Sequence, residues 1–245
     1  MIYDYTFKSQ RLLQGHCNKI KATACSDNKR WVVTADSGED SMLVVWDSLS
    51  ATPVRTFLNP HTNGVKCMDL SADCQYIVTI GAEDEIGQMQ TISLWDWLNE
   101  SAEGPIICMM CKQGIIENLH WVKFNPQNNH EIAVNGKERV AFLTWEIPSD
   151  KNTDGKKEPN VFTYYGTRID KRDFSSKEKA NNECTKTVFL PGTMAVTGTN
   201  RGDIIVWDES LIIEGVGEQN EKRQIKVVTL ISDAREDDFS QCCIE

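Results

Sequence analysis

Four tryptophans, each followed by an acidic residue, recur along this chain at a nearly regular interval. The pairs are Trp46-Asp47, Trp95-Asp96, Trp145-Glu146 and Trp207-Asp208. Successive tryptophans (95−46, 145−95, 207−145) are 49, 50 and 62 residues apart. Each pair closes an alternating apolar run such as Met42–Val45. Strands that end in this way at such a period are typical of stacked four-stranded blades, so the sequence predicts a β-propeller array.

Each repeat contains the same series of strands and turns. In the first repeat, strands are expected at Ile20–Cys25, Trp31–Ala35 and Met42–Asp47, separated by polar turns. The later repeats give Val65–Leu70, Tyr76–Ile80 and Thr91–Asp96; Leu119–Phe124, Glu131–Val134 and a strand ending at Trp145; and Thr187–Leu190, Met194–Gly198 and Ile204–Asp208. Period-two alternation with Gly, Asn-Gly and Pro-Gly turns indicates antiparallel strands, so the expected fold is all-β.

The predicted propeller is partial, with about four blades plus flanking strands over residues 1–232. The blades are expected to end near Asp47, Asp96, Glu146 and Asp208. Ile2–Asp4 matches the third strand of an earlier blade, and Gln224–Ile231 looks like the start of another repeat. Residues 148–182 are expected to be an inter-blade insertion with one strand-like piece, Val161–Tyr165, and 233–245 an acidic tail.

An open arc leaves two blade faces and several strand edges uncovered. We therefore expect this chain to be a fragment, or a short form completed by neighbours.

Composition excludes several classes of partner. Lys and Arg total 26 against 36 Asp and Glu, a formal net charge of −10. This balance argues against binding to nucleic acid or to an anionic membrane surface. No apolar stretch approaches the ~18 residues of a membrane span, and the N-terminus lacks the apolar region of a signal peptide. The nine cysteines are thus interpreted as thiols in a reducing, cytoplasmic compartment.

The repeats resemble the WD-repeat family, whose blades carry Gly-His, Ser/Thr, Asp and Trp-Asp in order. The first repeat matches best, with Gly15-His16, Thr34, Asp40 and Trp46-Asp47. The resemblance implies a buried hydrogen-bond chain through His16, Thr34, Asp40 and Trp46, which ties a loop to the strands.

The other repeats depart from this pattern. Met89 and Arg201 stand where the second and fourth repeats would carry the aspartate, and only His16 occurs as Gly-His. We therefore expect the other three blades to be held mostly by apolar packing.

A more specific resemblance covers Gln10–Phe57, including Leu13–Asn18, Arg30–Ser41 and Leu43–Ser48. This stretch is similar to the first propeller of the cilia- and flagella-associated WD-repeat proteins of the calmodulin- and spoke-associated complex. The resemblance implies a non-enzymatic scaffold in the axoneme of a motile cilium or flagellum, part of the cytoskeleton, which helps attach a radial spoke to the doublet microtubule and regulate motility. Its partners would be other axonemal proteins, namely radial-spoke base and complex subunits.

Reactive side chains do not form a recognisable catalytic, cofactor or metal motif. Cys108–Cys111 is a single CxxC without the second pair or histidines of a zinc site. His61, His120 and His130 share no metal-ligand spacing. Cys242–Glu245 has the frame of a prenylation box but a poor last residue and no polybasic run. We therefore predict no catalytic residues, no cofactor and no metal.

Trp97 follows a Trp-Asp pair, and we interpret it as partly exposed and a candidate contact residue.

Two other functions remain open on sequence grounds. The same fold could serve as a substrate receptor or scaffold in a cytosolic ubiquitin-ligase or signalling complex. A propeller could also be a catalytic domain, although no convergent cluster of acids, histidines or metal ligands around a channel supports that interpretation.

Overall fold

The computed structural model describes residues 1–83, 90–111, 118–146, 162–168, 183–192, 194–200, 202–210 and 224–231. Within these residues all regular structure is β, in four antiparallel four-stranded sheets and one two-stranded hairpin of β1 (Ile2–Asp4) and β2 (Ser9–Arg11). The predicted all-β class and the antiparallel four-stranded blades are therefore confirmed. Over the same residues, no helix has the length and apolar character that a membrane span requires.

The four sheets follow one another along the chain, and we call them blades 1 to 4. Blade 1 contains β3 (Ile20–Cys25), β4 (Trp31–Asp36), β5 (Met42–Asp47) and β6 (Thr52–Leu58). Blade 2 contains β7 (Val65–Leu70), β8 (Tyr76–Gly81), β9 (Thr91–Asp96) and β10 (Ile107–Met110). Blade 3 contains β11 (Trp121–Asn125), β12 (Asn128–Asn135), β13 (Arg139–Trp145) and β14 (Phe162–Arg168). Blade 4 contains β15 (Cys184–Phe189), β16 (Met194–Thr199), β17 (Ile204–Ser210) and β18 (Gln224–Ile231).

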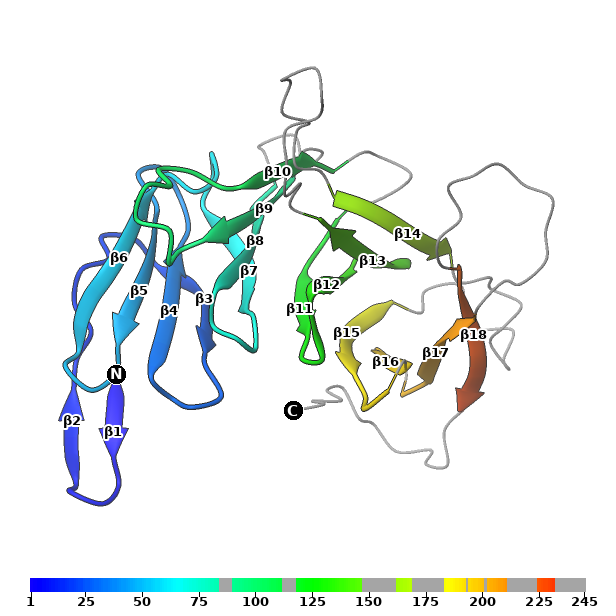
Figure 1. Ribbon diagram of the computed structural model, residues 1–245, viewed down its shortest axis with the longest axis horizontal. Coiled ribbons are helices and arrows are strands. Elements are labelled where there is room, and N and C mark those ends of the chain that lie inside the picture. Colours follow the sequence, from blue (N-terminus) through cyan, green and yellow to red (C-terminus); the bar gives the residue numbers. More distant parts are fainter. Residues whose placement is uncertain are drawn as a thin grey trace, which may run out of the picture.

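The blades stand side by side in an open arc (Figure 1). The first strands of successive blades, β3, β7, β11 and β15, are neighbours in space. In each blade the remaining strands follow in sequence order, so the fourth strand lies at the other edge of its sheet. Because each blade uses consecutive strands, the tryptophan of its third strand recurs once per blade along the sequence.

Two sequence expectations about the outer strands need correction. Residues 224–231 do not begin another repeat, because β18 pairs antiparallel with β17 and completes blade 4. Residues 162–168, inside the expected insertion 148–182, are the fourth strand of blade 3, which pairs with β13. Outer strands lack the Trp-acid ending, so the pattern that marks the third strands does not mark them. The expected tail 233–245 lies outside the described residues.

The hydrophobic core is divided among the junctions between blades. One cluster joins blade 1 to blade 2, another joins blade 2 to blade 3, and a third joins blade 3 to blade 4. Successive residues of one strand serve different junctions: Ile77 packs towards blade 1 and Val78 towards blade 3. Blades 2 and 3 are therefore buried on both faces, as the side-chain alternation of a strand allows.

The junction of blades 1 and 2 includes a very close approach of two backbones. Gly64, at φ +79°, forms an isolated bridge with Ser37. A Cβ atom at position 64 would lie 2.7 Å from the carbonyl oxygen of Asp36. Only glycine fits this position, because both the backbone angle and the space exclude a side chain.

Candidate functional site

The best-defined polar site lies in blade 1, where two side chains contact the same hydroxyl group. The indole Nε1–H of Trp46 donates to Thr34 Oγ1 at 2.7 Å, and His16 Nε2 lies 2.6 Å from the same oxygen. His16 Nδ1 lies 2.9 Å from a carboxylate oxygen of Asp36. If the imidazole of His16 carries its hydrogen on Nδ1, all three hydrogen bonds are satisfied. Nδ1–H then donates to Asp36, the Thr34 hydroxyl donates to Nε2, and the Trp46 indole donates to the hydroxyl oxygen.

Gly15, the residue before His16, lies against the ring of Trp46. A Cβ atom at position 15 would lie 3.3 Å from the Trp46 ring. A side chain here would make a tighter contact with the indole than most Cβ atoms make, so glycine lets the loop lie closest to Trp46, beside His16.

The acid of this network is Asp36, not the expected Asp40. Asp36 is fully buried at the end of β4, and its second oxygen accepts the backbone N–H of Met42 at 2.5 Å. Asp40 is exposed in the following turn, at φ 53°. The family spacing before Trp46 predicts Asp40, which is wrong because the segment between β4 and β5 carries extra residues.

Blade 2 contains an equivalent network that the sequence analysis missed. Trp95 Nε1 donates to Thr79 Oγ1 at 2.9 Å, and His61 Nε2 lies 2.8 Å from that oxygen. The hydroxyl of Thr91 replaces the carboxylate, 2.5 Å from His61 Nδ1. Gly81 stands where Asp36 stands in blade 1, and a Cβ atom there would lie 2.8 Å from the His61 ring. Blade 2 is therefore not held by apolar packing alone.

The repeated spacing of two residue types could have revealed this network. His16-x-Asn18 in the first repeat recurs as His61-x-Asn63 in the second. Asn18 Nδ2 donates to the carbonyl oxygen of Glu39, and Asn63 Nδ2 donates to that of Glu83. His-x-Asn is thus a better signal in this chain than Gly-His.

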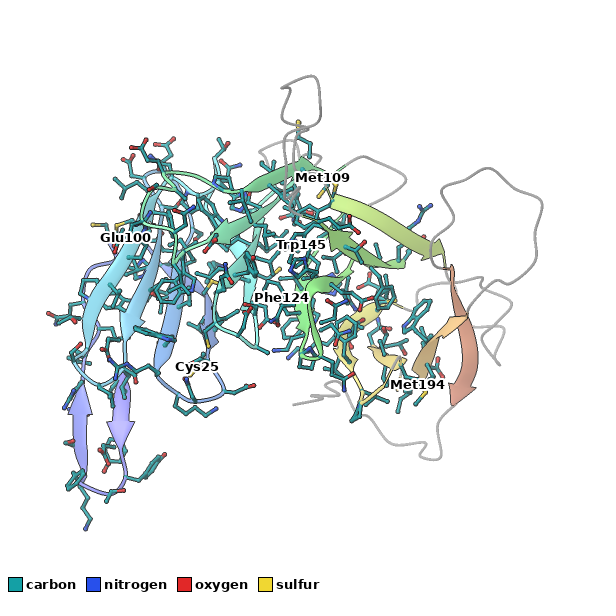
Figure 2. All side chains as sticks on the ribbon, in the orientation of Figure 1. Cys25, Glu100, Met109, Phe124, Trp145 and Met194 are labelled. Atoms are coloured by element: carbon teal, nitrogen blue, oxygen red, sulfur yellow. The ribbon has the colours of Figure 1, made fainter. Side chains whose placement is uncertain are left out.

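Blades 4 and 3 retain less of the network. In blade 4, Trp207 Nε1 donates to Thr197 Oγ1 at 2.8 Å, and Thr187 takes the place of the histidine at 2.6 Å. In blade 3 the hydroxyl position is occupied by Ile132, which pairs with Leu143, two residues before Trp145. Among the described residues, the buried Nε1–H of Trp145 has no hydrogen-bond partner. Figure 2 shows Trp145 in the densely packed centre of the molecule, near Phe124.

The acids after the tryptophans differ in their surroundings. Asp47 accepts from Arg30 Nη2 at 2.7 Å, and Asp96 accepts from Gln75 Nε2 at 3.2 Å. Arg30 and Gln75 occupy the same place in their repeats, so these contacts tie the third strand to the turn before the second. Glu146 is exposed, and the side chain of Asp208 lies outside the described part of blade 4.

Polar contacts also cross the blade junctions. Asp69 of β7 accepts the backbone N–H of Phe124 at 2.8 Å and an ammonium hydrogen of Lys123 at 3.1 Å. Burial raises the pKa of this carboxyl above its ordinary value, and the Lys123 charge opposes that shift. Between blades 3 and 4, Trp121 Nε1 donates to the carbonyl oxygen of Thr187. Such contacts fix the register of one blade against the next.

Trp97 belongs to a junction rather than to the surface. Its side chain is 4% exposed, against the expectation of a partly exposed contact residue. The ring packs edge-on against Trp31 at 5.2 Å, and Nε1 donates to the carbonyl oxygen of Cys74. Trp97 therefore joins blade 2 to blade 1.

The described cysteines are of two kinds, enclosed and accessible. Burial raises the pKa of the Cys67, Cys111 and Cys184 thiols to about 12, whereas Cys17, Cys25 and Cys108 are exposed. No group of three or more His, Cys, Asp or Glu residues with the geometry of a metal site occurs among the described residues. The candidate prenylation box 242–245 lies outside them.

Four-stranded antiparallel blades, two of which are tied by tryptophan, threonine and histidine, define this protein as a WD-repeat β-propeller. Solved propellers share the fold: Myceliophteria thermophila Cps50 (Swd1) aligns with a TM-score of 0.57 and 16% identity, over 80% of this chain and 53% of that domain. The structure of U3-55K aligns with a TM-score of 0.55 and 14% identity, over 81% of this chain and 51% of that one.

Within this class, the chain belongs to the family of the CFAP251 N-terminal domain, whose family model matches residues 1–236. Cilia- and flagella-associated protein 251 of Tetrahymena thermophila is 40% identical over 240 residues, which are 97% of this chain and 22% of that protein. The Chlamydomonas reinhardtii protein of the same name is 32% identical over 243 residues, which are 94% of this chain and 28% of that protein. The chain thus spans about a quarter of the length of these curated relatives.

The family resemblance and the ciliary or flagellar localisation predicted from the sequence are therefore confirmed.

Proposed function

We propose that this chain is a non-enzymatic scaffold segment of the axoneme, which helps attach a radial spoke to the doublet microtubule and so regulates motility. The observation that carries the proposal is membership of the CFAP251 N-terminal domain family over nearly the whole chain. The partners would be proteins of the radial-spoke base and of the calmodulin- and spoke-associated complex.

The geometry is suited to holding partners at fixed positions. Blades 2 and 3 are covered on both faces, and hydrogen bonds from Asp69 and Trp121 cross the junctions. A rigid arc presents the loops between its strands at set distances, and partners can recognise those loops without any change in the blades.

The test is expression of a tagged copy of the protein in a ciliated cell that lacks the endogenous one. We expect the tag in isolated axonemes, recovery of normal beating, and co-purification of spoke-base proteins. A matched control carries Gly64→Ala, which should disrupt the junction of blades 1 and 2 and reduce axonemal incorporation.

A diffuse cytosolic protein that co-purifies with ubiquitin-ligase or signalling subunits would contradict the proposal and favour the alternative scaffold. Turnover of a substrate by the purified protein would contradict its non-enzymatic part.

A further inference from the structure

A cavity of about 90 Å³ lies where the first strands of blades 1, 2 and 3 end. Cys25 is the last residue of β3, Leu70 is the last residue of β7, and Phe124 lies one residue before the end of β11. All three line the cavity, and Figure 2 labels Cys25 and Phe124. The volume suits a few water molecules or the end of one extended side chain, and it is too small for a nucleotide-sized ligand.

The hydroxyl groups of this cavity are already used inside their own turns. Ser26 Oγ accepts a hydrogen bond from the backbone N–H of Trp31 at 2.9 Å. Ser71 Oγ accepts from the backbone N–H of Tyr76 at 2.8 Å. Both hydroxyls also donate to the side chain two residues later. Recognition of a guest molecule therefore falls to the charged groups of the lining.

These charged groups have an excess of acid. Asp27 and Asp69 contribute two carboxyl groups to the lining, and Lys123 contributes the single ammonium group. Asp69 is 8% exposed and accepts hydrogen bonds from Lys123 Nζ and from the backbone N–H of Phe124. Asp27 is exposed, so solvent reaches the cavity at this residue.

The acidic groups are only partly compensated. Burial raises the pKa of the Asp69 carboxyl, and the Lys123 ammonium opposes that rise while its side chain stays 43% exposed. In the adjoining turn, burial and then the charges of Asp73 and Asp27 raise the pKa of the Cys74 thiol. The cavity thus lies in a region of negative potential, which one further cation would neutralise.

We propose that this cavity binds the cationic end of a lysine or arginine side chain from a partner protein. The cation would lie beside Asp69 and Asp27, and its hydrocarbon stem would contact Leu70 and Pro126, which also line the cavity. The net charge of −10 favours the approach of such a basic partner. The site requires only the three blades that form it, so this inference does not depend on the proposed axonemal function.

Photoaffinity labelling of the full-length protein tests the site. The probe is n-butylammonium with a diazirine on its chain, which reproduces the end of a lysine side chain. The neutral control probe carries a hydroxyl group in place of the ammonium group. We expect the cationic probe to label peptides that contain Ser26, Leu70 or Phe124, as mapped by mass spectrometry, and the neutral probe to leave them unlabelled.

Excess n-butylammonium or n-propylguanidinium should remove this labelling. The stronger competitor of the two identifies lysine or arginine as the preferred guest.

Two variants with the same change in net charge separate the cavity from the general acidity of the protein. Asp27→Asn removes a carboxylate from the lining, whereas Asp40→Asn removes an exposed carboxylate that is not part of it. We expect labelling to weaken about fivefold in Asp27→Asn and to stay unchanged in Asp40→Asn.

Equal weakening in the two variants would overturn the proposal, because it would reflect net charge alone. Equal labelling by the neutral probe would also overturn it, since the cavity would then select its guest by size and not by charge. Labelling that neither competitor removes would show that no saturable site exists, which overturns it as well. Circular dichroism of both variants verifies that the blades remain folded.

Discussion

Thr34 shows how much one small side chain contributes in this fold. Its hydroxyl is the shared partner of an indole N–H and an imidazole nitrogen, both buried. Thr79 and Thr197 take the same position in blades 2 and 4. Buried polar groups cost free energy unless they are paired, so a satisfied network of this kind allows one arrangement of loop and strands.

Substitution of the blade tryptophans by phenylalanine separates the hydrogen bond from the packing of the ring. Each variant loses part of the buried ring, but only Trp46→Phe and Trp95→Phe also leave a threonine hydroxyl without its donor. We expect these two to lose about 1–2 kcal/mol more unfolding free energy than Trp145→Phe. Urea titration measures the losses, and equal losses in all three would contradict the assigned role of the hydroxyl.

His61 makes the stability of blade 2 sensitive to acid. Burial lowers its pKa from 6.5 to about 4, so the unfolded chain binds a proton more readily than the folded chain between these values. The contribution of neutral His61 to the free energy of unfolding is therefore fully present above pH 6.5. It is lost as the pH falls towards 4, and the loss amounts to about 3 kcal/mol. Urea titrations between pH 7 and 4.5 should show a weaker pH dependence in His61→Gln than in the wild type; identical pH profiles would rule out this contribution.

At the scale of the element, the sequence predicts the three inner strands of each blade much better than the fourth. Inner strands such as β8 are buried along their whole length and end in recognisable turns. The outer strand β6 is mostly exposed and carries no clear apolar period. The sequence does indicate β18 as a strand, but the residues between β17 and β18 separate it from its partner, so it was assigned to the wrong repeat. Pairing, which is a tertiary property, assigned β14 and β18 to their blades.

The site was predictable where one repeat kept the family spacing and not where the spacing changed. His16, Thr34 and Trp46 lie together as the resemblance implied. Asp36 was missed because the family spacing points to Asp40, which the longer turn places in solvent. His61 was missed because the residue before it is proline rather than glycine.

Gly64 gives a test of the junction between β4 and β7. We expect Gly64→Ala to lose at least about 2 kcal/mol more stability than Gly192→Ala. Both glycines have positive φ, 79° and 95°, so both variants carry similar backbone strain. Only position 64 lacks space, since a Cβ atom at 192 meets nothing within 4 Å. Thermal melts of the two variants provide the comparison, and equal shifts would refute the importance of the close approach.

At the scale of the whole molecule, the described blades resemble a one-dimensional array in which the apolar clusters join neighbouring blades. Its three apolar clusters lie at three junctions, and none extends over more than two blades. In such arrays stability is approximately the sum of the blades and their interfaces. We therefore expect blades 2 and 3, which are covered on both faces, to be the most stable part of the arc.

Hydrogen exchange should reveal this gradient directly. Backbone amides of β8 and β12, in blades covered on both faces, should exchange most slowly, and those of β1 should exchange fastest because β1 belongs to a two-stranded hairpin. Mass spectrometry of proteolytic fragments after timed labelling measures both. Uniform protection across β1, β8 and β12 would contradict a junction-by-junction organisation.

The buried cysteines turn these junctions into chemical reporters. Cys111 lies in the cluster between blades 2 and 3, and Cys184 in the one between blades 3 and 4. A thiol whose pKa is raised to about 12 is almost entirely protonated at neutral pH and does not alkylate while it stays enclosed. The rate at which each cysteine acquires a maleimide label would consequently time the opening of its own interface, without any engineered probe.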